Sequence, residues 1–297
     1  MTFTFPPPLK SKLSLALRGF FMGAADVVPG VSGGTIAYIT GIYPQLIGAL
    51  ATFGRGWFSD MLSFNKTRTK HALKAVPYDF ILPLFVGIIG ALVLFVWCLS
   101  LGEMVAAHPL PFGGVFFGFV GMSALFLLRR YGSTCPRLML FVLAGYLAAA
   151  KGATLIPVTT PDTPWVVFLS GMLAISAMVL PGVSGALVLV VLGQYRYILT
   201  SLKELDLAVI LPFIGGIVLG LLLFGHGLNW LMQHFYRQTM LVMVGLLLGS
   251  LHALWPFGSM TANSDNIAVF SLFAALGSAV IVVLHVWEGL LKKDGGS

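Results

Sequence analysis

The segment ADVVPGVSGGTIAYITGIYP, residues 25–44, places a carboxylate, two prolines and four glycines inside an otherwise apolar stretch. A close copy, ISAMVLPGVSGALVLVVLGQYRY, spans residues 175–197, and the two PGVSG motifs start at Pro29 and Pro181, 152 positions apart. Proline lacks an amide hydrogen and disfavours helix before it, and glycine lets the backbone turn. The sequence therefore predicts that a helix is broken in the same way twice.

The composition indicates an integral membrane protein with several spans. The chain of 297 residues is 58% hydrophobic and 9% charged, with a mean hydropathy of +0.96, whereas soluble domains carry about 25% charged residues. Apolar runs long enough to cross a hydrocarbon core of about 30 Å recur from residue 80 to residue 287. Residues 1–13, MTFTFPPPLKSKL, have no apolar core and no small-residue cleavage site, so we expect a cytoplasmic tail and not a signal peptide.

The chain contains an internal duplication. LPLFVGIIGALVLFVW, from Leu82, matches LPFIGGIVLGLLLFGH, from Leu211. We expect a first repeat over 14–158 and a second over 159–297, each with one broken segment (14–52 and 165–202) followed by three spans. The expected spans are about 80–101, 112–129 and 137–155 in the first repeat, and about 208–226, 238–255 and 266–288 in the second.

The distribution of positive charge predicts how the halves are oriented. If each broken segment returns to its own side, the two termini and the loops 53–79, 129–137 and 227–237 share one face, which then holds 14 of the 17 Lys and Arg. Positive residues mark the cytoplasmic face, so we expect cytoplasmic termini. Three spans per half is an odd number, which inverts the second half. The predicted fold is an all-α integral membrane protein with an inverted-topology internal repeat, each half one re-entrant helical hairpin plus three transmembrane helices.

The broken segments predict an anion site. Backbone that is not helical at membrane depth must sit within protein or line a wet cavity. New helices are expected to start at about 33–35 and 184–185, where first-turn amides and a partial positive charge favour a phosphate or carboxylate. Breaks entering from opposite faces would meet near the midplane, as in alternating-access transporters; the alternative is a kink that only helps helices to pack. The candidate substrate-binding residues of the motifs are Pro29, Gly30, Ser32, Gly33, Gly34, Thr35, Pro181, Gly182, Ser184 and Gly185.

Three charged residues near the breaks are further candidates. Asp26 lies at a depth where a carboxylate is costly, and it could cap the glycine-rich turn, pair with an arginine, or carry a proton that couples transport to a gradient. Arg18 and Arg196 flank the two broken segments, and a guanidinium can bind phosphate through two parallel hydrogen bonds. Arg129 and Arg130 are expected to anchor the cytoplasmic side.

GAADVVPGVSGGTIAYITGIYPQLIGAL, from residue 23, and LPGVSGALVLVVLGQYRYIL, from residue 180, resemble the bacterial polyprenyl-phosphate transporter family, and the resemblance covers essentially the whole chain. It implies recycling of undecaprenyl phosphate, the lipid carrier of cell-envelope synthesis, across the bacterial plasma (inner) membrane. The partners that it implies are a polyprenyl-phosphate lipid and the membrane lipids. Protons as coupling ion and a homo-oligomer both stay open.

Other function classes fit the sequence less well. A secondary transporter of a small soluble anion would use broken helices equally well and is the main alternative. A membrane enzyme is not expected, because there is no GxSxG motif, no carboxylate pair beside a base, and no charged side chain between residues 170 and 193. The histidines lack HxxxH or HExxH spacing and the two cysteines suggest no site, so we expect neither a metal nor a cofactor. The charge of +7 is read as a membrane-face signal, not as nucleic-acid binding.

Overall fold

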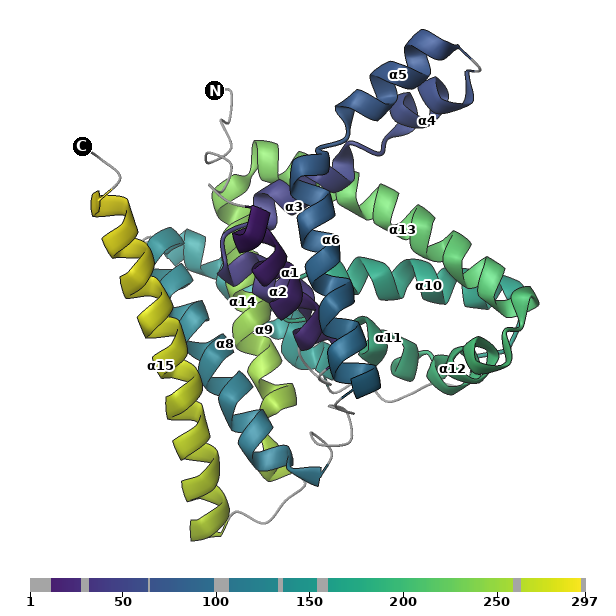
Figure 1. Ribbon diagram of the computed structural model, residues 1–297. Coiled ribbons are helices and arrows are strands. Elements are labelled where there is room, and N and C mark those ends of the chain that lie inside the picture. The colour runs from purple at the N-terminus through teal and green to yellow at the C-terminus, as the bar shows by residue number, and fades with distance from the viewer. Residues whose placement is uncertain are drawn as a thin grey trace. The chain divides into compact units, whose positions relative to one another are not determined.

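The computed structural model describes residues 12–27, 32–63, 65–98, 107–132, 136–153, 160–258 and 263–294, and these are helical with no strand among them (Figure 1). The helices of the first half are α1 (Lys12–Val27), α2 (Gly33–Ile39), α3 (Tyr43–Ala51), α4 (Arg55–Leu62), α5 (Lys66–Ala75), α6 (Tyr78–Leu92) with a π-helical end (Val93–Cys98), α8 (Pro109–Tyr131) and α9 (Pro136–Ala153). Those of the second half are α10 (Pro164–Val179), α11 (Gly185–Val191), α12 (Tyr195–Glu204), α13 (Leu207–His234), α14 (Tyr236–Leu254), a 3-10 turn (Pro256–Gly258) and α15 (Ser264–Asp294).

Four helical segments of the described residues are long and apolar enough to cross a membrane: Tyr78–Phe95, Pro109–Tyr131, Leu207–His234 and Ser264–Val283. A fifth is obtained if α11 and α12, which are bent by 113°, are counted as one broken span. The segments expected to span at about 137–155 and 238–255 are helical, as α9 and α14, but are not among the four. The protein is therefore a multi-pass helical membrane protein, and the expected total of six spans remains a prediction.

The chain divides into two compact units, Met1–Leu99 with Leu155–Thr239 and Ser100–Thr154 with Met240–Ser297. Each unit contains segments from both sequence halves, so the units are not the two repeats. The repeat boundaries and the inversion of the halves remain predictions.

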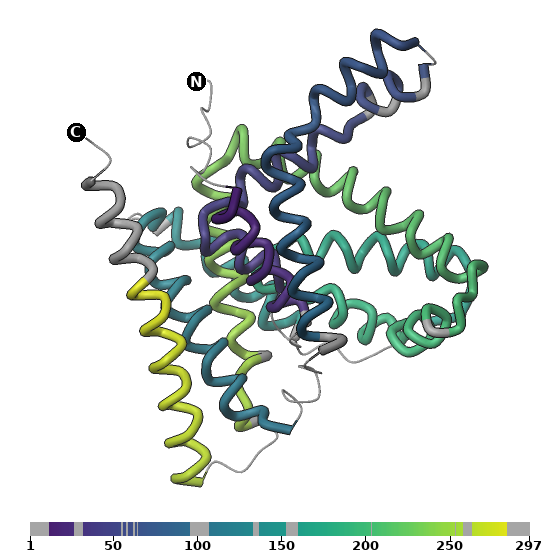
Figure 2. Tube along the Cα trace, viewed as in Figure 1, coloured from purple at the N-terminus to yellow at the C-terminus, as the bar shows by residue number. Residues whose placement is uncertain are grey.

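In the first unit two helix pairs cross at close range, α1 with α6 and α10 with α13 (Figure 2). Gly19 and Gly87 each face the backbone of the partner helix in the first pair, and Gly171 and Gly216 do so in the second. A side chain at any of these positions would strike a carbonyl group of the neighbour. Small residues at such crossings let membrane helices approach closely, and the sequence duplication has repeated this contact.

The turns that follow α2 and α11 are also alike. Gly41 and Gly193, 152 positions apart, adopt φ of +76° and +70°, the left-handed region that favours glycine. The N–H of the next residue bonds the carbonyl oxygen five positions earlier, at 3.0 Å for Ile42 and 2.9 Å for Gln194. This is the hydrogen-bond pattern of a Schellman helix end. The duplicated sequences thus fold into the same local structure.

In the second unit α8 packs along α15, and α9 packs against α14. Gly118 of α8 lies against the backbone of Ala274, and Gly277 of α15 lies against the backbone of Val115. Gly145 of α9 makes the corresponding contact with α14. The second unit therefore uses the same glycine-mediated packing as the first.

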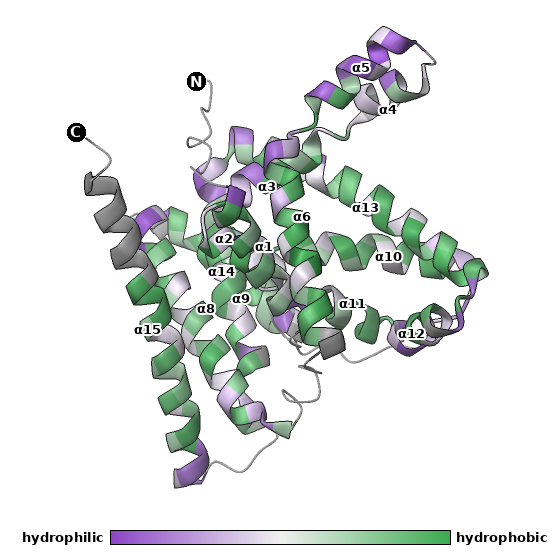
Figure 3. Cartoon of the chain, viewed as in Figure 1, coloured by the Kyte–Doolittle hydropathy of each residue, from purple (hydrophilic) through white to green (hydrophobic). Residues whose placement is uncertain are grey.

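The stretch expected as a basic loop over 53–79 contains two short helices, α4 and α5, of which α5 is mostly hydrophilic (Figure 3). Asn65 caps α5 by accepting from the N–H of Thr67 at 3.0 Å, and the Trp57 indole N–H donates to the carbonyl oxygen of Ala72 at 3.0 Å. The basic side chains of α5 are exposed: Lys66, Arg68, Lys70 and Lys74. This basic stretch is thus a helical hairpin and not an irregular loop.

Candidate functional site

The helices after the two breaks begin where the sequence predicted. α2 starts at Gly33 behind the N-cap Ser32, and α11 starts at Gly185 behind the N-cap Ser184. Both helices are only seven residues long. Since the macrodipole sums aligned peptide units, such short helices contribute little charge by themselves, and any site must rest on side chains and cavity shape.

We define the first elbow as the described residues of 26–43, from the end of α1 to the start of α3. The second elbow is 178–194, from the end of α10 to the turn after α11. A cavity of about 130 Å³ lies at the two elbows, within the first unit. This volume equals about four water molecules. Its lining residues are Asp26, Ser32, Met178, Ser184, Gly185 and Ala186.

The amides of the first elbow are already occupied, contrary to the expectation that they are free for a ligand. The N–H of Gly33 donates to Asp26 Oδ1 at 2.7 Å, and the N–H of Gly34 donates to Ser32 Oγ at 3.2 Å. Of the three roles considered for Asp26, capping the glycine-rich turn is therefore the one that its geometry displays. The buried start of α2 is satisfied from within its own elbow.

The second elbow differs, because the Ser184 side chain makes no capping hydrogen bond to α11. Its helix start lies close to α10, and a Cβ at Gly185 would be 2.7 Å from the carbonyl oxygen of Ala174. Ser184 and Gly185 both line the cavity. This elbow therefore offers the cavity a hydroxyl that caps no helix.

Three hydrogen bonds join the elbows of the two halves. They run from Ser32 Oγ to Met178 O (3.0 Å), from Tyr43 Oη to Val179 O (3.1 Å) and from the N–H of Gly182 to Thr35 Oγ1 (2.8 Å). Met178, Val179 and Tyr43 are not among the residues that the sequence predicts for the site. Their partners lie more than 130 positions away, so no local signal could have found them.

The remaining candidates lie beside the cavity or apart from it. Arg18 donates from Nη1 to the carbonyl oxygen of Thr40 at 2.7 Å, at the end of α2. Arg196 is exposed in the first turn of α12, and the length of α11, about 10 Å, separates it from Ser184. Neither arginine lines the cavity. Pro181 is buried within the second elbow. Pro29 and Gly30 lie outside the described residues.

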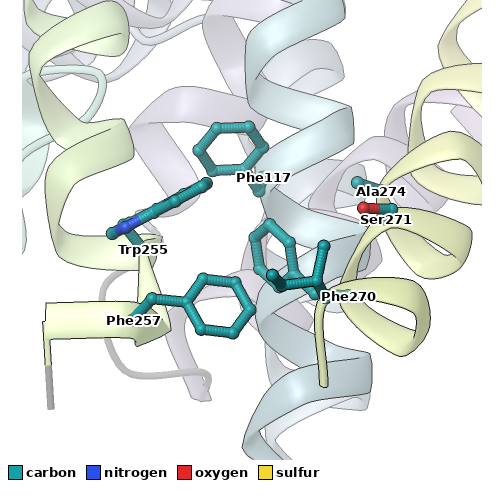
Figure 4. A pocket seen from close by; sticks show the side chains of 7 residues that line it. Phe117, Trp255, Phe257, Phe270, Ser271 and Ala274 are labelled. Atoms are coloured by element: carbon teal, nitrogen blue, oxygen red, sulfur yellow. The ribbon is translucent and has the colours of Figure 1, made fainter. Parts of the chain in front are cut away.

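A second cavity, of about 370 Å³, lies within the second unit and is aromatic (Figure 4). Among the lining residues, the ring of Phe270 packs against three others, with its centroid 5.4 Å from that of Phe117 and 5.6 Å from those of Trp255 and Phe257. Ile267, Ser271 and Ala274 complete the lining. None of these side chains is charged, so a charged headgroup would find no partner here.

The described residues contain no group of three or more His, Cys, Asp or Glu that could hold a metal ion. The fold and the small polar cavity define a class of protein: a multi-pass helical membrane protein in which two broken helices of a duplicated sequence meet.

The comparisons with known proteins narrow this class to one family. The profile of the VCA0040-like family, described as undecaprenyl phosphate translocase-like, matches residues 22–270, so the chain belongs to this family. It is 36% identical over 246 residues to the polyprenyl-phosphate transporter of Vibrio cholerae serotype O1, covering 82% of this chain and 78% of that protein. It is 29% identical over 269 residues to the polyprenyl-phosphate transporter of Staphylococcus aureus, covering 81% and 85%. No solved structure matches the chain.

Proposed function

We propose that this protein is a polyprenyl-phosphate transporter that returns undecaprenyl phosphate across the bacterial plasma membrane for reuse in cell-envelope synthesis. The observation that carries this proposal is the cavity at the two PGVSG elbows, which places the side chains of Asp26, Ser32 and Ser184 together in an otherwise apolar helical protein. Family membership and the names of both relatives support the substrate class. Enzymatic chemistry forms no part of the proposal.

The phosphate headgroup is proposed to bind in the cavity lined by Asp26, Ser32 and Ser184. At about 130 Å³, this cavity is below the range of about 300–1,000 Å³ that takes a drug-sized ligand. Its volume suits a group as small as a phosphate, and a polyprenyl tail would have to remain in the surrounding lipid. Such division of a ligand between a small polar site and the bilayer is what a lipid transporter requires.

We further propose the membrane topology predicted from charge: six spans, two hairpins that re-enter from opposite faces, and cytoplasmic termini. The repeated glycine crossings and the similar turns at Gly41 and Gly193 support a duplicated unit. The exposed basic side chains of α5 fit a cytoplasmic location for residues 53–79. Inversion of the second half would bring both elbows to the membrane midplane.

Asp26 is proposed as the residue that carries a coupling proton. Its carboxylate lines the cavity and accepts from the N–H of Gly33. An ionised carboxylate beside a phosphate is unfavourable, so uptake of a proton by Asp26 would favour headgroup entry. Proton movement and phosphate movement would then be linked at one site.

The small size of the cavity also favours a second candidate, a transporter of a soluble anion such as inorganic phosphate. A competition experiment on purified protein separates the two. Binding of labelled undecaprenyl phosphate is measured against unlabelled polyprenyl phosphate, polyprenyl diphosphate and inorganic phosphate. We expect only the polyprenyl monophosphate to compete well. Equal competition by inorganic phosphate would favour the soluble-anion transporter.

The location of the site is tested with a double variant, Ser32→Ala with Ser184→Ala. We expect its affinity for undecaprenyl phosphate to fall at least tenfold, because hydrogen bonding of the cavity hydroxyls to a charged group is lost, whether one serine or both donate. The matched control is Ser123→Ala, whose hydroxyl bonds only the Phe119 carbonyl of its own helix at 2.6 Å. Unchanged affinity in the double variant would remove the headgroup from this cavity.

A further inference from the structure

The two serines that the duplication relates, Ser32 and Ser184, have different surroundings. Ser32 Oγ accepts from the N–H of Gly34 and donates to the carbonyl oxygen of Met178 at 3.0 Å. A hydroxyl carries a single proton, so Ser32 has none left for a ligand while the bond to Met178 is intact. The Ser184 hydroxyl caps no helix and faces the same cavity.

The first elbow satisfies backbone groups of the second. The last four carbonyls of a helix have no partner within that helix, and Met178 and Val179 hold two of these carbonyls in α10. The Ser32 hydroxyl donates to the carbonyl oxygen of Met178. The hydroxyl of Tyr43, whose side chain is fully buried, donates to that of Val179. Thr35 accepts from the N–H of Gly182, two residues before Ser184.

These three hydrogen bonds hold the segment that leads to Ser184. Residues 180–184 connect the end of α10 with the start of α11. They are held from the first half at Met178, Val179 and Gly182. In all three bonds the side chain belongs to the first elbow and the backbone group to the second.

We propose that the two elbows have different roles in the site, one binding the phosphate and the other positioning the binding residue. Ser184 donates to the phosphate, and Ser32, Thr35 and Tyr43 are positioning residues that clamp the chain leading to it. This inference rests on the proposed function, since it assigns roles within the same phosphate site.

A double-mutant cycle on purified protein, with undecaprenyl phosphate as the probe, tests this division. Ser184→Ala is expected to raise Kd about tenfold, the ratio contributed by a hydrogen bond to a charged group. Ser32→Ala and Tyr43→Phe are each expected to raise Kd about threefold in the wild-type background, as expected for a neutral hydrogen bond. In the Ser184→Ala background they should have no further effect, because the group that they position is gone.

Two controls separate positioning from a general loss of structure. Thr40→Val removes a hydroxyl that bonds within α2 (2.7 Å to the Ile36 carbonyl oxygen), and Ser176→Ala removes one that bonds within α10 (2.7 Å to Met172). Both should keep Kd within twofold of wild type. Thr35→Val should weaken binding, and Thr35→Ser, which keeps an acceptor for Gly182, should restore it.

The outcomes distinguish the inference from the proposed function. If Ser184→Ala leaves Kd unchanged, the role assigned to Ser184 is overturned; if the Ser32→Ala, Ser184→Ala double variant also binds normally, the proposed phosphate site is wrong. If Ser184→Ala weakens binding and Ser32→Ala multiplies Kd by the same factor in both backgrounds, Ser32 contacts the phosphate itself. The site would then stand and the division of roles would be overturned.

Discussion

Gly34→Ala probes the contact between the elbows with a single methyl group. A Cβ at Gly34 would lie 2.8 Å from the carbonyl oxygen of Val179 and 2.9 Å from that of Met178, where ordinary contact begins at 3.4 Å. Both neighbours are backbone, so the end of α10 must move away by about 0.6 Å. That shift lengthens the bonds from Ser32 and Tyr43, now 3.0 and 3.1 Å, to about 3.6–3.7 Å, beyond hydrogen-bond range.

The expected cost follows from these changes. Overpacking costs about 1–3 kcal/mol, and two lost hydrogen bonds cost about 0.5–1.5 kcal/mol each. Alanine returns about 1 kcal/mol through its better helix propensity. The net loss is about 1–5 kcal/mol, with a central value near 3 kcal/mol, which should lower the thermal unfolding midpoint of the purified protein by roughly 6–12 °C.

The matched control for Gly34→Ala is Gly90→Ala in α6, where a Cβ meets nothing within 4 Å. This variant gains helix propensity without a clash, so its unfolding midpoint should equal or exceed that of wild type. If Gly34→Ala is as stable as Gly90→Ala and binds undecaprenyl phosphate normally, the close approach of the two elbows is refuted.

Three other measurements test separate parts of the structure. Phe270→Ala should destabilise the protein by about 3–5 kcal/mol because a buried ring is lost, whereas Phe85→Ala, at a ring that is 55% exposed, should have a small effect on unfolding. In intact cells an impermeant thiol reagent should fail to label a cysteine at Lys70 and should label one at Asp162; the reverse pattern contradicts the proposed orientation. In proteoliposomes Asp26→Asn, which retains an oxygen acceptor for the backbone, should abolish any dependence of transport on a pH gradient, and retained dependence rejects a proton role for Asp26.

The positions of the helix breaks were predictable because their causes are local. Proline and glycine act on their own backbone and immediate neighbours, and Ser32 and Ser184 occupy the N-cap positions of the following helices, as the motif indicates. The helical hairpin α4–α5 was missed, although Asn65 before the helical stretch is a recognised start signal.

The hydrogen bonds that connect the site residues could not be predicted from the sequence, because they depend on tertiary contacts. The carboxylate of Asp26 meets Gly33 only through the path that the chain takes around the break. Tyr43 reaches Val179 across 136 positions of sequence. The two PGVSG copies are identical in sequence and were predicted to have the same role, whereas Ser32 and Ser184 have different hydrogen bonds. A duplicated sequence predicts shared backbone structure better than shared side-chain roles.

The glycine crossings have a mechanical consequence. Where α1 meets α6 and α10 meets α13, the backbones touch so closely that even a methyl group would collide with a neighbouring carbonyl. Neither helix of a pair can slide along the other without such collisions, so we expect each pair to move as one rigid body. Any change of conformation during transport would then be confined to the short turns between helices. Substitutions that stiffen the turns at Gly41 and Gly193 should therefore slow the conformational change without altering the packing within each pair.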